Sequence, residues 1–401
     1  MIKLYQPLND KLCIQDYYNG NHRINGCGII LNMAIIGYDK LPSTPQPIMV
    51  AMSGGVDSSV AAALLIEQGY QVSGILMRLY ETISNDNKFQ RSLDKAQEVS
   101  ARLNIPLEII DYREEFRKRV IGYFLLSQQK GITPNPCFIC NVKIKWGLLL
   151  GNVLARGVNW LASGHYARIV KNNQNKMELY KGMDPGKDQS YVLSGLDQNT
   201  LSHMVLPLAA YSKNQIREIA RRYNLDFKSV DDSQDLCFFD GLGQEEFLNR
   251  YAKELFIPGE IKTQDGRLVG MHNGLANYTI GQRKGLGAGN KEPIYVLRKD
   301  IIQNVLIVGP GSQLGRKDIS VTDVNWISGD EPPLPDEFDI KIRYRSTPKR
   351  GTLNKNNRAG YDIIFAEPIR DPTPGQIAVF YKNDQVIGSA FISDTTSGEN
   401  I

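Results

Sequence analysis

The sequence predicts an α/β protein: a parallel-sheet domain, then a small β-rich central domain and a C-terminal β-barrel. Three observations lead to this prediction. Strand and helix patterns alternate from residue 48 to about residue 242, as in a parallel sheet with helices on both faces. The first strand runs directly into a glycine-rich turn. After about residue 243 helical periodicity fades, and short β patterns separated by turns follow.

Apolar runs predict the strands of the first domain, at residues 48–52, 72–77, 107–111 and 160–162. Apolar side chains at helical spacing predict helices at residues 88–103, 114–128 and 141–150. A further helix begins at Ser212, because Ser212 and Gln215 fit a capping box. Ligands of such sheets bind beyond the carboxyl ends of the strands, where residues 53–59 and 164–165 should meet.

The second half is expected to consist of short strands, at residues 305–308, 339–344, 361–366, 377–381 and 385–392. We therefore expect four parts: an N-terminal extension or linker (1–47), the parallel-sheet domain (48–242), the central domain (243–308) and the barrel (309–401). Residues 1–47 differ in composition from the rest and end in a proline-rich run, so a disordered linker is one interpretation of them.

The turn after the first strand reads Ser53-Gly54-Gly55-Val56-Asp57-Ser58-Ser59. Its glycines permit positive φ and a close approach of the backbone to a ligand. The following helix would point free amide groups and the positive end of its dipole at an anion. The serines add hydroxyl donors, and Asp57 can cap the helix or hold Mg²⁺. The sequence therefore predicts a phosphate site, and the alternative is an ordinary capped Gly-Ser turn.

The spacing of this turn narrows the class of phosphate site. It lacks the Lys-Ser/Thr ending of the Walker loop and the G-x-G-x-x-G spacing of a dinucleotide fold. The heptad resembles the pyrophosphate loop (PP-loop) of the ATP pyrophosphatases. These enzymes cleave ATP between the α- and β-phosphates and adenylate a carbonyl oxygen.

Composition excludes several classes of protein. A chain of 401 residues that is 42% hydrophobic and 22% charged is typical of an ordinary globular protein with several domains. No apolar run approaches the roughly 20 residues that span a bilayer, so no membrane partner is expected. The net charge of +4 does not by itself indicate nucleic acid. Five cysteines without a visible signal peptide indicate a reducing compartment, and we expect a cytoplasmic protein.

Three of the cysteines lie in or near distinctive motifs. Cys137 and Cys140 belong to the segment Thr133 to Asn141, and Cys237 follows far along the chain. We expect Cys140 to lie at the start of a helix and close to Lys143. Both the helix start and the lysine would favour the thiolate form. A structural zinc site would need a second C-x-x-C, and a thioredoxin-like pair belongs to another fold. A cooperating pair for sulfur transfer is the third interpretation, and a buried inert Cys237 is the fourth. Cys13 and Cys27 are interpreted as inert.

Together these motifs resemble the bacterial tRNA-uridine 2-sulfurtransferases, or tRNA-specific 2-thiouridylases, a family of the PP-loop superfamily. The similarity runs from about Ile48 to about Asp394. The matching segments occur in the family order at residues 53–59, 133–141, 164–167, 187–191, 236–238 and 278–286.

The resemblance implies an ATP- and Mg²⁺-dependent thiolation of the wobble uridine in the tRNAs for Lys, Glu and Gln. The uracil C2 oxygen is adenylated, and a persulfide on Cys237 delivers sulfur while Cys140 acts as the partner thiol, so that a disulfide forms between them. A cysteine desulfurase or a sulfur-relay protein supplies the sulfur. Because Cys137 stands where some relatives have Asp, a second interpretation is an iron–sulfur cluster bound by Cys137, Cys140 and Cys237.

The resemblance also implies two sets of binding residues. Those for ATP are Ser53, Gly54, Gly55, Val56, Asp57, Ser58, Ser59, Met77 and Gly164. Those for tRNA are Asn135, Pro136, Cys137, His165, Lys187, Asp188, Gln189, Arg343, Tyr344 and Gln376, of which residues 135–137 contact the target base. The alternatives are a core role for Met77, a structural hydrogen bond for His165 and a solvated turn at residues 187–189.

Basic residues in the predicted barrel strengthen the expectation of a tRNA partner. They surround Tyr344 and comprise Lys341, Arg343, Arg345, Lys349 and Arg350. In an extended strand, positions 341, 343 and 345 would share one face, where arginine suits phosphate and tyrosine can stack on a base. A solvated basic strand face is the alternative.

Two other functions remain open at this point. A PP-loop amide-forming ligase, such as an NAD or GMP synthetase, would need neither the cysteine pair nor the basic barrel. A tRNA-binding protein with an inactive nucleotide site would not need the intact PP-loop.

One hypothesis is that translation starts at Met33 and that residues 1–32 are an upstream artefact, because the first 47 residues resemble neither the rest of the chain nor an organelle transit peptide. Mass spectrometry of the native N-terminus should find no peptide from residues 1–32. Detection of such a peptide would contradict this expectation.

Overall fold

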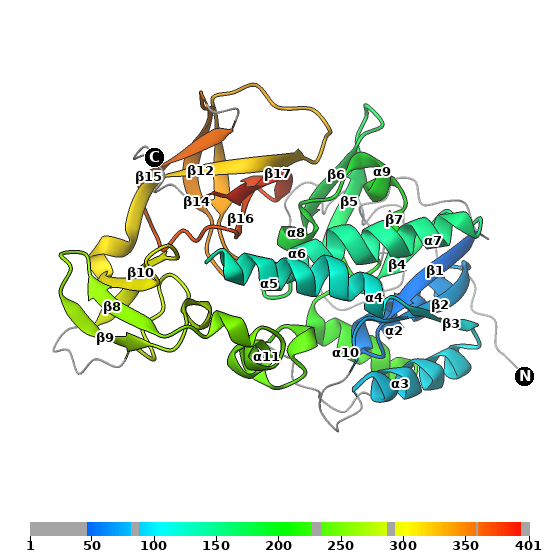
Figure 1. Cartoon of the computed structure of the whole chain (residues 1–401). Coiled ribbons are helices and arrows are strands. Elements are labelled where there is room, and N and C mark those ends of the chain that lie inside the picture. Colours follow the sequence, from blue (N-terminus) through cyan, green and yellow to red (C-terminus); the bar gives the residue numbers. More distant parts are fainter. Residues whose placement is uncertain (1–45, 82–87, 226–234, 287–292, 358–359, 394–401) are drawn as a thin grey trace, which may run out of the picture.

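The structure is a computed structural model that describes residues 46–81, 88–225, 235–286, 293–357 and 360–393 (Figure 1). The expected extension lies outside the described residues apart from its last two positions, and so do Cys13 and Cys27.

The first domain is built on a parallel five-stranded sheet in the order β3-β2-β1-β4-β7. Its strands are β1 (Pro47–Met52), β2 (Gln71–Arg78), β3 (Leu107–Asp111), β4 (Leu161–Ser163) and β7 (Met204–Val205). Both faces of β1 are buried, since Ile48 and Val50 point into one core and Met49 into the other. Near-continuous apolar runs are what a sheet covered on both faces requires.

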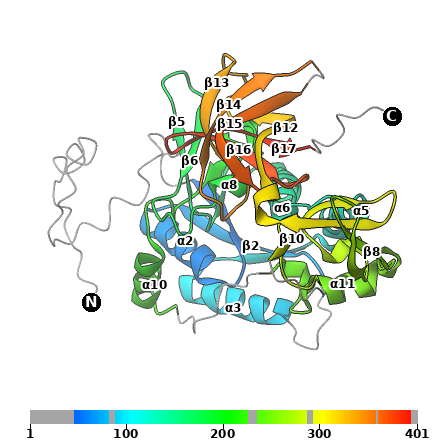
Figure 2. The same cartoon turned by 90° about the vertical axis from the view of Figure 1, so that its left-hand side faces the viewer.

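Helices α2 (Val56–Glu67), α3 (Lys88–Leu103) and α10 (Lys213–Arg222) pack on one face of this sheet (Figure 2). The predicted capping box at the start of α10 is present, because Ser212 and Gln215 exchange hydrogen bonds. The other face is covered by a long helical segment and by the short helices α8 (Ser190–Leu193) and α9 (Gln198–Ser202).

That long segment is continuous from Pro136 to Ala155: α6 (Pro136–Cys140), a π-helical stretch η2 (Asn141–Leu149) and α7 (Leu150–Ala155). Before it lie α4 (Arg113–Phe116), the π-helical turn η1 (Arg117–Ile121) and α5 (Gly122–Gln129). The sequence indicated that no apolar run approaches the length that spans a bilayer. By length and composition, however, the helix of residues 136–155 could cross a membrane, with a mean hydropathy of 1.3. Trp146, Leu149 and Val153 instead pack this helix into the core, as in the core helix of a globular domain.

The central part contains a four-stranded sheet in the order β10-β11-β8-β9. Its strands are β8 (Gly259–Thr263), β9 (Leu268–His272), β10 (Ile294–Asp300) and β11 (Val305–Pro310). Short 3-10 turns occur at η3 (Cys237–Phe239), η4 (Lys253–Leu255), η5 (Leu275–Asn277) and η6 (Gly311–Leu314). The part also contains the helix α11 (Gly243–Tyr251), where the sequence indicated that helical periodicity fades. Phe247 and Leu248 anchor α11 in an aromatic cluster with Phe238 and Phe239.

The C-terminal part is a six-stranded barrel, closed by pairing of its first and last strands. Its strands are β12 (Gly315–Trp326), β13 (Asp336–Lys341), β14 (Lys349–Lys355), β15 (Tyr361–Arg370), β16 (Ile377–Lys382) and β17 (Gln385–Ile392). The predicted fold class is therefore confirmed. The strand expected at 339–344 instead ends at Lys341, so positions 341, 343 and 345 do not share a strand face. Arg343 and Ser346 exchange hydrogen bonds in a turn that follows the strand.

A hairpin that the sequence did not predict joins the first domain to the barrel. It consists of β5 (Ala167–Lys171) and β6 (Met177–Lys181), and β6 pairs with β17 through Leu179 and Val386 (Figure 1). The barrel sheet thus extends to eight strands in the order β12-β15-β14-β13-β16-β17-β6-β5. Leu179 is fully buried in the core that lies between the two parts.

Replacing Leu179 with Ala should lower the free energy of unfolding by about 2–5 kcal/mol, because it leaves a cavity at this junction. Urea unfolding followed by circular dichroism measures the change. The matched control is Ile364→Ala on the barrel surface, where the side chain is 54% exposed and the expected change is within about 0.5 kcal/mol. Equal effects of the two substitutions would contradict the assignment of Leu179 to the core.

Candidate active site

The glycine-rich turn connects β1 to α2 in the strand–turn–helix order that the sequence predicted. Gly54 has a φ of +72°, and a Cβ there would lie 2.4 Å from the Ser92 carbonyl oxygen, so only glycine fits. Gly55 is the N-cap of α2, and no side chain caps this helix. The Ser58 hydroxyl accepts from the Ser53 amide at 3.1 Å and donates to the Gly55 carbonyl at 3.2 Å. The turn is therefore rigid, and the amide groups of the first helical turn can bind an anion.

Gly164, after β4, lies directly against the start of α2. A Cβ at Gly164 would come within 2.8 Å of the backbone of Asp57 and Ser58. This close approach brings the ends of β1 and β4 together around a cavity of about 190 Å³, here called the nucleotide cavity. Its lining includes Ser53, Asp57, Ser58, Met77, Gly164 and His165.

Asp57 has two partners that the sequence did not reveal. The Lys213 ammonium donates to both carboxylate oxygens at 2.7 Å, and the Tyr166 hydroxyl donates to one of them at 2.6 Å. Only 13% of the Lys213 side chain is exposed. Lys213 is the first residue of α10, which follows β7 at the same edge of the sheet. The sequence did show a lysine directly after the predicted N-cap Ser212. It did not indicate that the partner of this lysine is Asp57.

Mg²⁺ bound at Asp57 would compete with this ion pair. Mg²⁺ bound with ATP needs one or two carboxylates besides the phosphates, and Asp57 has the right chemistry. Its oxygens, however, are already used by Lys213 and Tyr166.

His165 is both hydrogen-bonded and exposed to the nucleotide cavity. Its Nδ1 lies 2.7 Å from the Ser163 hydroxyl, and its ring packs near the Trp146 indole. Burial, reinforced by the positive charge of Lys145, holds the pKa of His165 well below its ordinary value. The ring is therefore neutral at physiological pH.

The three predicted cysteines converge on one cavity of about 380 Å³, here called the cysteine cavity. Cys137 and Cys140 enter it from α6, and Cys237 from the 3-10 turn η3. All three are free thiols. The remaining lining is largely apolar and includes Tyr80, Phe116 and Phe238. The cysteine and nucleotide cavities share Met52, Ser53, Met77 and Lys145, so they adjoin each other.

The thiol pKa values differ from the sequence prediction. Cys140 lies inside the continuous helix, not at a helix start, and burial raises its pKa to about 11. Desolvation raises the pKa of Cys237 to about 12, with a further contribution from Cys140. Burial also raises the pKa of Cys137. Lys145 opposes all three shifts, Lys88 also lowers the pKa of Cys237, and Lys143 is exposed.

The cysteines do not form a metal centre in this arrangement. Among the described residues, no group of three or more His, Cys, Asp or Glu side chains is placed to hold a metal ion. The iron–sulfur cluster on Cys137, Cys140 and Cys237 therefore gains no support from this arrangement and stays a prediction.

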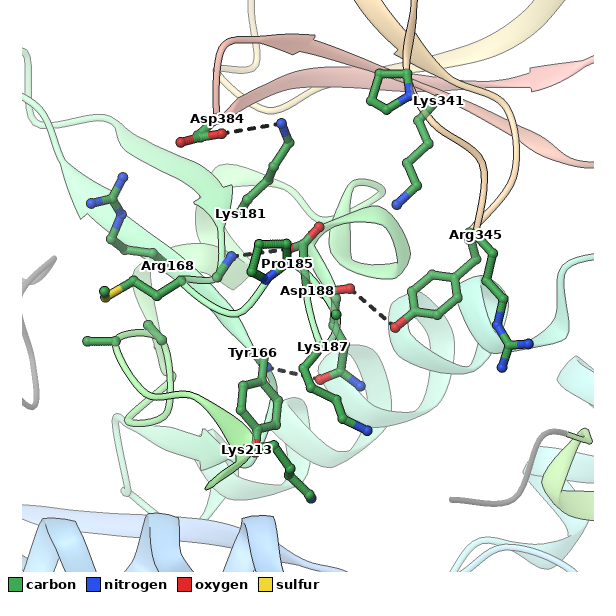
Figure 3. A pocket seen from close by; sticks show the side chains of 18 of the residues that line it. Tyr166, Arg168, Lys181, Pro185, Lys187, Asp188, Lys213, Lys341, Arg345 and Asp384 are labelled. Carbon is green, nitrogen blue, oxygen red and sulfur yellow. Dashed lines mark hydrogen bonds and ion pairs between the residues drawn. The ribbon is translucent and has the colours of Figure 1, made fainter. Parts of the chain in front are cut away.

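A third and larger cavity, of about 1330 Å³, lies between the first domain and the barrel (Figure 3). Six cationic side chains line it: Arg168, Lys181, Lys187, Lys213, Lys341 and Arg345. Asp57 and Gln189 line both this basic cavity and the nucleotide cavity, so the two spaces are neighbours.

The predicted loop at residues 187–189 contributes to this cavity in different ways. Lys187 lies on its wall (Figure 3). Asp188 is buried and accepts from the amides of Gly182 and Ser190 at 3.1 and 3.0 Å, so its carboxylate shapes the loop. The Gln189 side chain accepts from the Tyr166 amide at 2.9 Å.

The three predicted tRNA residues of the barrel make internal contacts. Arg343 donates to the Asp371 carboxylate at 3.1 Å and to the Thr373 hydroxyl at 2.5 Å. The Tyr344 hydroxyl donates to the Asp188 carbonyl at 3.2 Å, while 39% of the residue stays exposed. Gln376 donates to two carbonyls of the loop before α6.

The residues expected beside the target base surround the start of α6. The Asn135 side chain accepts from the Phe138 amide at 3.1 Å and so caps this helix. Pro136 occupies its first turn, where the missing N–H costs nothing. Pro136 and Cys137 line the cysteine cavity.

Three family models match consecutive parts of the chain: the tRNA methyl transferase HUP domain (46–241), the tRNA methyl transferase PRC-barrel domain (245–310) and the aminomethyltransferase beta-barrel domain (316–392). The tRNA-specific 2-thiouridylase MnmA of Magnetococcus marinus is 40% identical over 354 residues, 87% of this chain and 99% of that protein. The tRNA-specific 2-thiouridylase MnmA of Carboxydothermus hydrogenoformans is 40% identical over 368 residues, with coverage of 90% and 99%.

Among solved structures, the U34-tRNA thiolase NcsA from Methanococcus maripaludis, with its 4Fe-4S cluster, aligns with a TM-score of 0.32. It is 17% identical and covers 52% of this chain and 66% of that chain. A likeness of this size supports no inference about the site.

Lys145→Met should slow alkylation of Cys237 and Cys140 by iodoacetamide, because removing the cation raises both thiol pKa values further. In the unmodified protein the alkylation rate should rise about tenfold per pH unit between pH 7 and 9, since the thiolate fraction grows in proportion below the pKa. Peptide mass spectrometry measures the rate at each cysteine. Lys143→Met is the matched control and should change neither rate; equal slowing by both substitutions would contradict the role given to Lys145.

Proposed function

This chain belongs to the tRNA-specific 2-thiouridylase family and is a tRNA-uridine 2-sulfurtransferase, and from that premise we propose its target, its reaction and its site residues. The target is the wobble uridine, the first anticodon position, of the tRNAs for Lys, Glu and Gln. The observation that most supports a two-step reaction is the contact between the nucleotide cavity and the cysteine cavity at Ser53, Met77 and Lys145.

The first step activates the base. A uracil C2 carbonyl is a poor electrophile, so its oxygen attacks the α-phosphorus of ATP and pyrophosphate leaves. The rigid turn at residues 53–59 and the amides of α2 would hold the phosphates. Met77 and Gly164 line the same cavity and would contact the nucleotide. Mg²⁺ bound with ATP would neutralise phosphate charge, and Asp57 would hold it after giving up Lys213.

The second step replaces oxygen with sulfur. The terminal sulfur of a persulfide on Cys237 attacks C2, and AMP leaves with the former carbonyl oxygen. The Cys140 thiolate then attacks the Cys237 sulfur, which forms a Cys140–Cys237 disulfide and releases the 2-thiouridine. A cellular thiol reductant restores the two thiols, and a cysteine desulfurase or a sulfur-relay protein reloads Cys237.

The surroundings of the cysteines suit this order of events. Burial raises the pKa of Cys140, and desolvation by its surroundings raises that of Cys237 although this side chain is exposed, so both shifts favour the protonated thiol in the ligand-free protein. A protonated thiol is a poor nucleophile and a poor target for oxidants. Lys145 lies at the junction of both cavities and favours the thiolate of both cysteines. The apolar aromatic lining of the cysteine cavity suits an unstacked base.

The tRNA would approach over the basic cavity between the first domain and the barrel. Lys187, Lys341 and Arg345 would neutralise its phosphates. Asn135, Pro136 and Cys137 would lie beside the target base, and the neutral His165 ring would face it from the nucleotide cavity. We propose a cytoplasmic enzyme, and a tRNA substrate supports this location. The two other functions considered from sequence, an amide-forming ligase and an inactive tRNA-binding protein, do not match the activity of the family.

Cys237→Ser should abolish 2-thiouridine formation and leave tRNA affinity within about twofold, because it removes the sulfur carrier and almost no surface. The assay incubates tRNA with ATP, Mg²⁺, cysteine and a cysteine desulfurase, and analyses nucleosides by liquid chromatography–mass spectrometry. Asp57→Ala is the complementary variant: it should lose pyrophosphate release, whereas Cys237→Ser should retain it. Normal thiolation by Cys237→Ser would refute the assignment of this residue as the carrier.

A further inference from the structure

A turn of the barrel is docked against the loop that leads to the reactive cysteines. We call residues 373–376 the barrel turn and residues 132–135 the cysteine loop. The side-chain nitrogen of Gln376 donates to the carbonyls of Thr133 and Pro134, at 3.1 and 3.0 Å. The Thr133 amide donates in return to the Pro374 carbonyl at 3.0 Å.

The fit between the two segments is close. Gly375 has a φ of +86°, and a Cβ there would lie 2.0 Å from the Ile132 side chain and 2.8 Å from the Thr133 carbonyl oxygen. Only glycine provides both this conformation and this space. The barrel fixes its own side of the contact, since the Gln376 amide donates to the Thr373 carbonyl and its carbonyl accepts from the Ile392 amide.

The cysteine loop depends on these bonds because of its own sequence. Pro134 and Pro136 carry no N–H, so the loop has few backbone donors with which to hold itself. Its carbonyls at Thr133 and Pro134 instead accept the two N–H groups of one side chain, Gln376. The next residue, Asn135, caps α6 and so sets the start of the helix that carries Cys137 and Cys140.

We propose that Gln376 is a positioning residue for the cysteine loop: it holds Cys137 and Cys140 at the cysteine cavity. This proposal depends on the proposed reaction in one respect: the effect on turnover assumes that the reaction uses the Cys140 thiol. It adds to the tRNA contact that the resemblance implies for Gln376. Both N–H groups of its amide are donated to the loop, so its side-chain oxygen is the atom left to accept from a donor of the tRNA, such as a ribose hydroxyl.

The test compares Gln376→Glu and Gln376→Met with the unmodified full chain. Each substitution removes both donors at nearly constant size. We expect Cys140, now 8% exposed, to be alkylated by iodoacetamide at least fivefold faster. The turnover number for thiolation should fall about tenfold, while the KM for tRNA and the tRNA dissociation constant stay within twofold. Thermal unfolding followed by circular dichroism verifies that each variant is folded.

Asn354→Asp is the matched control, because its side-chain amide also donates to a barrel carbonyl, that of Thr352 at 3.4 Å, away from the cysteine loop. It should change neither alkylation nor turnover. A weaker tRNA affinity with unchanged Cys140 alkylation would overturn the proposal in favour of a tRNA contact, and so would no change at all. The alkylation rate needs no thiolation activity, so a failure of the proposed reaction would leave this readout intact.

Discussion

The backbone contact between Gly164 and the first turn of α2 is the constraint on which the site depends. It brings the ends of β1 and β4 together at a distance that no larger residue at position 164 would allow. The nucleotide cavity lies at this contact, and Asp57 lines both this cavity and the basic cavity. The helix from Pro136 to Ala155 then carries Cys137, Cys140 and Lys145, and Cys237 reaches the same cavity from η3.

Two lysines dominate the electrostatics of the site, because each lies beside a carboxylate or beside thiols that can become thiolates. Lys213 neutralises Asp57 before any nucleotide arrives, and Lys145 opposes the desolvation of the three thiols. A half-buried lysine interacts more strongly with such groups than an exposed one would, because water screens it less.

Sequence reasoning succeeded where structure is determined locally and failed where it depends on distant contacts. The segment from β1 to α2 was predictable, since an apolar run, paired glycines and a helical pattern lie next to one another. The hairpin β5–β6 was missed because its strands are short and half polar, and because its partner β17 lies about two hundred residues later. The thiolate expected at Cys140 rested on a local argument from Lys143, and burial among distant aromatic side chains outweighs it. The pairing of Lys213 with Asp57 likewise follows from the position of β7 at the sheet edge.

The continuous sheet from β6 to β17 also determines how the chain can be divided. Cutting the chain before the barrel would leave β6 as a bare edge strand, with the unpaired N–H and C=O groups that drive strands of separate molecules together. It would also expose the apolar side chains that the first domain shares with β16 and β17. The boundary between these two parts is therefore a change of architecture along the sequence, but it is not a place where the protein can be separated into independent pieces.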